Sequence, residues 1–220
     1  MRRRVWLATR RVVLVATSCL SASLAHAQST VNETWQELDV YWTEPSQEFR
    51  LYGLAQVARG LETTDRQLTL GLHVDYLPLA WGFVRIGYRW IRSLEDLSAP
   101  EERALAEVDY PKTRGKVRFR GRTRVEFRWI GGEPSQRLRQ RVEVEREVRL
   151  SRKQSLIPYA TFELYWDSRY HAISRSAYRI GSKYVISHPV TVDLSVARQD
   201  NRFGSPRTVN ALWLRLELNY

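Results

Sequence analysis

Two side chains in the last quarter of the chain have the types that ester hydrolysis requires. His171 and Ser174 are three residues apart, and Asp167 precedes His171 by four residues. A hydrolytic triad needs a nucleophile and a base within hydrogen-bond reach, with a third group that orients the base. The sequence therefore offers Ser174 as nucleophile, His171 as base and Asp167 as orienting acid. The alternative, a loop histidine beside ordinary polar residues, is far commoner.

A second set of side chains forms a charged ladder over residues 116–150. Charged and apolar residues alternate on both sides of Gly131-Gly132, with Arg146 as an exception on the second apolar face, as in two strands that each have one charged and one apolar face. Opposite charges facing each other across strands are favourable. We therefore predict a hairpin that pairs Arg122 with Glu145, Arg124 with Glu143, Arg120 with Glu147 and Glu126 with Arg141, with Arg118 on the same face.

The charged ladder has two interpretations. It either fills the interior of a narrow barrel as an ion-pair network or lines a charged conduit, and the long Arg and Glu side chains favour the filled interior. A conduit would pass small anions, because arginine exceeds acid on these faces. His73 and Asp75 share a face but are too few for a metal site, and we expect no metal and no cofactor.

The same two-faced pattern continues along most of the chain, which predicts an all-β fold. Strands are expected at 48–59, 66–77, 81–92, 101–110, 116–130, 137–151, 154–167, 176–187, 189–199 and 207–220. Tyr76, Tyr110 and Tyr184 fall at one set of strand ends, and Trp90 and Trp129 at the other. Two aromatic belts of this kind are typical of outer-membrane barrels, whereas in a soluble sandwich the aromatics point inward at mid-strand.

These strands predict an antiparallel up-and-down transmembrane β-barrel over residues 47–220. Residues 28–46 form an N-terminal segment in which 35–42 can add a further strand. Single-chain bacterial barrels have an even number of strands, so we expect about ten strands, with twelve as the alternative. Short turns at 77–80, 151–153 and 187–189 should lie at one end, and the longer loops at 93–100, 131–136, 168–175 and 200–206 at the other.

The N-terminus has the features of an export signal. Arginines at 2–4 precede an apolar run over 12–24, and Ala25-His26-Ala27 is a small-x-small cleavage site, so residues 1–27 are expected to be a signal peptide. The only cysteine, Cys19, lies within it. The remaining chain therefore has no disulfide. Five arginines belong to the signal, and the rest of the chain has 30 basic and 24 acidic residues, a balance that does not suggest nucleic-acid binding.

Two resemblances follow from these residues. The alternating end Trp213 to Tyr220 resembles the C-terminal assembly signal of outer-membrane barrels, which the barrel-assembly machinery recognises, with Tyr220 as its terminal aromatic. Residues 35–220 resemble a family of small Gram-negative outer-membrane barrels labelled domain of unknown function 2490 (DUF2490). The matching features are Trp35, Gly87-Tyr88-Arg89, Glu101-Glu102-Arg103, Arg122-Thr123-Arg124-Val125-Glu126, Glu163 and Arg179-Ile180-Gly181, in that order. This resemblance implies a location rather than an activity.

We therefore expect an exported porin-like barrel of a Gram-negative outer membrane, surrounded by outer-membrane lipids. The residues favour a structural or narrow-pore role with no catalytic site. The alternatives are an outer-membrane lipid hydrolase that cleaves acyl esters with His171 and Ser174 at the outer rim, and a soluble periplasmic β-protein.

Overall fold

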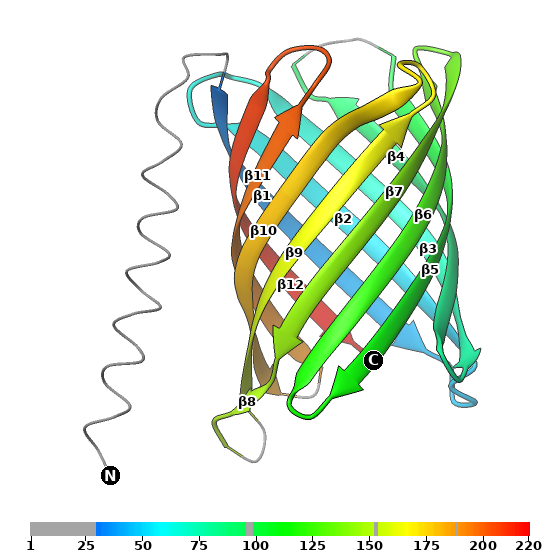
Figure 1. Ribbon diagram of the computed structural model, residues 1–220, viewed down its shortest axis with the longest axis vertical. Coiled ribbons are helices and arrows are strands. Elements are labelled where there is room, and N and C mark those ends of the chain that lie inside the picture. Colours follow the sequence, from blue (N-terminus) through cyan, green and yellow to red (C-terminus); the bar gives the residue numbers. More distant parts are fainter. Residues whose placement is uncertain (1–29, 96–98, 152–153, 188) are drawn as a thin grey trace.

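The protein folds into a closed β-barrel in a computed structural model that describes residues 30–95, 99–151, 154–187 and 189–220 (Figure 1). The strands are β1 (Thr30–Thr43), β2 (Phe49–Gly60), β3 (Arg66–Leu79), β4 (Gly82–Ser93), β5 (Glu101–Arg114), β6 (Val117–Ile130), β7 (Glu133–Arg146), β8 (Val148–Arg149), β9 (Ser155–Asp167), β10 (Ala172–Ser187), β11 (Val190–Asn201) and β12 (Thr208–Asn219). The expected signal peptide, residues 1–27, lies outside the described residues.

Eleven strands close the barrel, one more than the ten that we expected. Consecutive long strands pair antiparallel, and the two-residue β8 pairs only with the beginning of β9, outside the ring. The additional strand is β1, which pairs antiparallel with β2 and parallel with β12. Strand β1 is hydrogen-bonded along both edges and is therefore a full strand of the ring. With β1 included, the number of strands is odd, and the rule of an even strand number does not hold here. The predicted all-β antiparallel barrel is confirmed, with β1 and β12 as a parallel pair that the prediction did not include.

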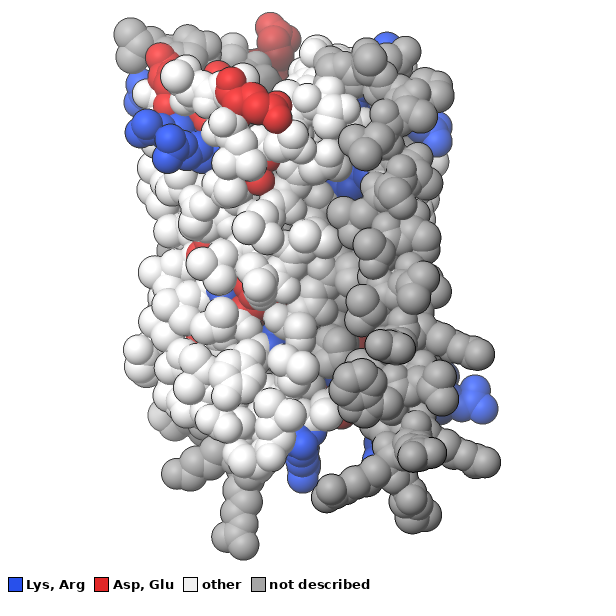
Figure 2. Space-filling model, turned by 90° about the vertical axis from the view of Figure 1, so that its left-hand side faces the viewer, with Lys and Arg blue, Asp and Glu red and all other residues white. Residues whose placement is uncertain are grey.

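Alternation along each strand separates a charged interior from an apolar exterior. Glu37 and Asp39 of β1 and Asp75 of β3 point inward and are buried. Leu72 and Ile180 point outward, and each is 65% exposed. Figure 2 shows one side of the exterior, where uncharged side chains dominate a broad middle band, with a few charged atoms visible between them, and larger charged groups lie near the two ends. In the described part of the chain, no helix is long and apolar enough to cross a membrane.

The turns lie at two opposite ends of the barrel (Figure 1). The connections after β1, β3, β5 and β10 and the C-terminus lie at one end, which we call the C-terminal end. The connections after β2, β4, β6, β9 and β11 lie at the other, which we call the loop end. The connections that were predicted to be short thus lie at the C-terminal end, and those that were predicted to be longer lie at the loop end.

The hairpin of β6 and β7 has a register that differs by four residues from the predicted one. Arg118 is opposite Glu145, Arg120 opposite Glu143, Arg122 opposite Arg141, Arg124 opposite Arg139 and Glu126 opposite Arg137. The cause is the turn. Gly131 and Gly132 both have positive φ, 60° and 88°, and form a two-residue connection of the kind that favours glycine. Ile130 therefore pairs directly with Glu133, and β7 begins four residues earlier than expected.

Candidate functional site

The half of the interior near the C-terminal end is filled by charged side chains. Six acidic side chains from five strands are there at most 2% exposed, and we call them the buried acid layer. They are Asp39, Asp75, Glu107, Asp109, Glu145 and Asp193, and His73 beside them is 1% exposed. Charges remain in such a place only when they are paired and hydrogen-bonded.

Basic side chains connect the buried acid layer across the barrel. Arg85 of β4 bonds to Asp75 at 2.5 Å and lies 3.7 Å from Glu107. On the opposite wall, Arg215 of β12 reaches Asp193 at 2.5 Å and Asp39 at 3.5 Å. Solvent has almost no access to these acids, so this half of the lumen is packed rather than open.

The other half encloses a chamber of about 620 Å³ that extends toward the loop end. Its wall contains four acids, Glu33, Glu37, Glu163 and Asp167, and thirteen arginines. These are Arg85, Arg89, Arg103, Arg122, Arg124, Arg128, Arg137, Arg139, Arg141, Arg169, Arg175, Arg179 and Arg215. Tyr170 and Phe203, from the connections after β9 and β11, stack at 4.4 Å between ring centroids and form part of the rim. The chamber wall is thus rich in guanidinium groups.

Most of these arginines share a few acids. Glu163 accepts hydrogen bonds from Arg139 at 3.0 Å and Arg141 at 3.1 Å. Asp167 accepts them from Arg128 at 2.9 Å, Arg137 at 3.3 Å and Arg169 at 2.9 Å. Arg169 lies in the turn beyond β9, and its hydrogen bond to Asp167 raises the pKa of its guanidinium. Glu126 also bonds to Arg139 at 2.8 Å and Glu101 to Arg103 at 2.8 Å, so the uncompensated positive charge lies on the arginines that reach no acid.

Three chamber arginines have no carboxylate within 4.0 Å among the described residues. Arg89 bonds to His73 Nε2 at 3.2 Å, and Arg175 bonds only to the amide oxygens of Asn201 at 2.6 Å and Gln199 at 2.7 Å. Arg179, 6% exposed, lies over the Trp213 ring at 4.4 Å. A buried charge without a counter-charge is costly. Arg179 is buried and Arg89 and Arg175 are half-buried, so these three guanidiniums form the strongest anion-attracting feature of the wall.

Apart from Glu147, the predicted ladder residues lie in the interior, with new partners. Arg118 bonds to Glu145. Arg120 bonds to Asp109 at 2.9 Å and lies 3.7 Å from Glu143. The partners of the following arginines come largely from β5, because Asp109 is opposite Arg122 and Glu107 is opposite Arg124.

Glu147 was predicted to pair with Arg120 and does not. It follows the end of β7, its side chain is 51% exposed, and it lies 3.7 Å from Arg149. Because the register shift moves Glu143 opposite Arg120, Glu147 falls beyond the paired part of the strand and outside the interior network.

The three candidate hydrolytic residues lie at the loop end but are not joined into a triad. In the described part of the chain, no hydrogen bond connects the side chain of His171 with Ser174 or Asp167. The Ser174 hydroxyl is buried and donates to the carbonyl oxygen of Tyr165 at 3.3 Å. Both oxygens of Asp167 are occupied by arginines, and Arg169 bonds to each of them. A base oriented by an acid, which a triad requires, is not formed in this geometry.

Several residues of the chamber escaped the sequence analysis. Arg137 and Arg139 lie on the charged face of the predicted strand 137–151 but were given no partner, and Arg175 was placed in a loop. A bulge between Ile173 and Arg175 in β10 resets the alternation there. No metal site was expected, and no group of three or more His, Cys, Asp or Glu suited to a metal ion occurs among the described residues.

The fold and interior define a closed β-barrel with a charged lumen and an apolar exterior. A family model described as "Protein of unknown function (DUF2490)" matches residues 31–218, and the chain belongs to that family. The membership that the sequence motifs predicted is confirmed. Among solved structures, LpxR from Salmonella typhimurium is similar at a TM-score of 0.52 and 9% identity, over 79% of this chain and 83% of that one, a likeness of fold. No curated protein matches.

Proposed function

We propose that the protein is a non-enzymatic outer-membrane barrel that binds small anions in its arginine-lined chamber. The buried acid layer beneath the chamber keeps the barrel from conducting in this conformation. The observation that carries the proposal is the set of Arg89, Arg175 and Arg179, which line one chamber without a carboxylate partner among the described residues. An anion there would supply the counter-charge that the protein itself does not provide.

Several features support placement in an outer membrane. The exterior band is apolar, the interior is charged, and long strands close into a barrel without free edges, which is the arrangement that membrane barrels require. The predicted signal peptide and the terminal aromatic Tyr220 agree with export and with recognition by the barrel-assembly machinery. Outer-membrane lipids are then the surroundings of the apolar band. In this placement, the loop end faces outward.

The chamber is tested by the effect of anions on stability. A ligand that binds only the folded barrel stabilises it, by about 2.7 kcal/mol when its free concentration is about 100 times Kd. We expect sulfate to raise the unfolding temperature of the detergent-solubilised barrel more than chloride does at equal ionic strength. The double variant Arg175→Gln with Arg179→Gln should lose most of this difference.

The matched control is Arg198→Gln. Arg198 lies near the loop end of β11, its side chain is 40% exposed, and it pairs with Asp200 outside the chamber. Its variant should keep the full sulfate effect. Equal stabilisation by sulfate in wild type and in the chamber double variant would contradict the proposal. Planar-bilayer recording tests the other half of it, because a steady open conductance of the wild-type barrel would be incompatible with a packed acid layer.

A further inference from the structure

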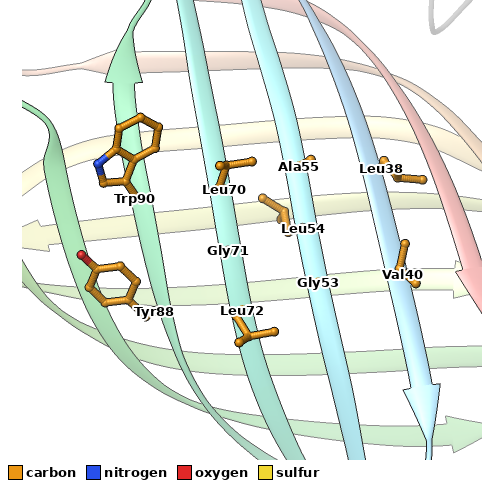
Figure 3. Close-up of a pocket in the computed structure, with 10 residues that line it drawn as sticks. All are labelled: Leu38, Val40, Gly53, Leu54, Ala55, Leu70, Gly71, Leu72, Tyr88 and Trp90. Carbon is orange, nitrogen blue, oxygen red and sulfur yellow. The ribbon is translucent and has the colours of Figure 1, made fainter.

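The exterior of the barrel carries a groove along β2, in the middle of the apolar band. Its floor is formed by the small residues Gly53 and Ala55. In the neighbouring strands Val40 and Leu72 lie beside Gly53, and Leu38 and Leu70 lie beside Ala55. Figure 3 shows these side chains from outside the barrel, with Tyr88 and Trp90 of β4 along the far side. The hollow has a volume of about 450 Å³. Two small residues between larger ones therefore make a channel one side chain wide.

The line of the groove leads to a cluster of outward-pointing arginines. Beyond Ala55, the outward residues of β2 are Val57 and then Arg59. Arg59 lies opposite Arg66 of β3, and Arg92 of β4 lies one row nearer the middle, opposite Leu68. At about 3.3 Å per residue, Arg59 is about 13 Å from Ala55 along the strand.

The arginine cluster has an uncompensated charge. Like charges directly opposite in adjacent strands destabilise a sheet, and Arg59 and Arg66 are such a pair. Arg66, whose side chain is 53% exposed, lies 3.4 Å from Glu95. Among the described residues, neither Arg59 nor Arg92 has an acid within 4.0 Å. An anionic group between Arg59 and Arg66 would turn a repulsive pair into two favourable ones.

We propose that this face binds one lipid that carries a phosphate headgroup. Its phosphate lies against Arg59 and Arg66, with Arg92 nearby, and one of its acyl chains lies in the groove over Ala55 and Gly53. The occupant is a lipid because the anion-attracting cluster and the apolar groove lie on one line, about the separation between a lipid headgroup and the middle of its chain. A groove only one side chain wide suits a single acyl chain better than a helix.

The proposal depends on the membrane placement of the barrel and is independent of anion binding in the chamber. Native mass spectrometry of the complete barrel, released from detergent micelles, measures it directly. The probe is phosphatidic acid, and diacylglycerol with the same chains is the comparison lipid. We expect phosphatidic acid to bind at least about tenfold more tightly, since two guanidiniums contact its phosphate.

Two kinds of variant test the two parts of the site. The double variant Arg59→Gln with Arg66→Gln should remove the preference for phosphatidic acid over diacylglycerol. Gly53→Leu should weaken the binding of both lipids, because the added side chain occupies the groove. An added Cβ at Gly53 meets no atom closer than the carbonyl oxygen of Val40 at 4.0 Å, so this variant should fold.

The controls lie elsewhere on the same exterior. Ala160→Leu adds a similar volume on the outward face of β9, between Val144 and Ile180, and should leave binding unchanged, as should Arg198→Gln. The chamber variant Arg179→Gln should also bind phosphatidic acid normally, which separates this inference from the proposed function. Equal binding of the two lipids by the wild type would overturn it. So would competition by inorganic phosphate at concentrations similar to those of the lipid, because the groove would then contribute nothing.

Discussion

Arg122 of β6 lies directly opposite Arg141 of β7, a pairing of like charges in the middle of the hairpin. Each guanidinium is held by carboxylates of other strands. Arg122 bonds to Asp109 at 3.1 Å and lies 3.3 Å from Glu107, and Arg141 bonds to Glu163 at 3.1 Å. The charges of the interior are therefore balanced around the barrel and not within one hairpin.

The hairpin register can be tested with engineered cysteines, because the only native cysteine, Cys19, lies in the predicted signal. Thr123 and Gln140 are opposite each other, and their side chains are hydrogen-bonded at 2.7 Å. The pair Thr123→Cys with Gln140→Cys should form a disulfide on mild oxidation, read by mass spectrometry. Thr123→Cys with Val144→Cys, the pair that the predicted register would place together, is offset by about 13 Å along the strand and should not. Cross-linking of the second pair alone would restore the predicted register.

Glu107→Gln should destabilise the barrel strongly. Glu107 is 1% exposed and lies within 2.5 Å of Arg124, 3.3 Å of Arg122 and 3.7 Å of Arg85. Removing one partner of a buried ion pair leaves an uncompensated charge and costs about 3–5 kcal/mol. Denaturant unfolding of the barrel in lipid vesicles measures the loss.

Glu147→Gln is the matched control for that prediction. Its side chain is 51% exposed, and the nearest basic group, on Arg149, is 3.7 Å away. Exposed pairs contribute about 0–1 kcal/mol, so this variant should unfold nearly as the wild type does. A similarly small effect of Glu107→Gln would mean that water screens the acid layer.

Ile180→Arg should show where the membrane lies. Ile180 is in the middle of β10, points outward and is 65% exposed. An arginine on the lipid face at the midplane of a bilayer costs about 2–4 kcal/mol, and near the interface only about 0–1 kcal/mol. Ile186→Arg, near the C-terminal end of the same strand, should therefore be much milder. Equal free energies of unfolding for the two variants in vesicles would argue against a transmembrane band centred on β10.

Deletion of Tyr220 should reduce the amount of assembled barrel rather than its stability once formed. Tyr220 is 67% exposed, and its backbone pairs with Tyr41 and Thr43 of β1 at 2.8 and 2.9 Å, so its ring makes little contribution to packing. Assembly can be followed in cells by the heat-dependent shift of a folded barrel on gels. Tyr220→Phe keeps the terminal aromatic and should assemble normally. Normal levels of the deletion variant would show that the ring is not an assembly signal.

The sequence alone was sufficient to predict ten of the eleven barrel strands and the two faces of most of them. A strand has a side-chain period of two, so the alternation of Arg and Glu with Val, Phe and Leu over 117–130 assigns each residue to the interior or the exterior without knowledge of its neighbours. Nine of the ten expected strands lie close to their predicted positions. For example, β3 ends at Leu79 and β9 ends at Asp167, where ends at 77 and 167 were predicted. The family could be predicted in the same way, because the motifs that identify it are also short stretches of sequence.

The tertiary structure decided which strands meet and with what register. One chain pattern permits several registers, and the two-residue turn at Gly131 and Gly132 selected one that faces Arg122 with Arg141. Closure of the ring by β1 and β12 made the barrel eleven-stranded. The chamber depends on both, because Arg89 and Arg179 come from β4 and β10, and only ring closure brings them to one cavity. Such long-range pairing has no period in the sequence, so local alternation could assign the residues to the lumen but could not determine their partners.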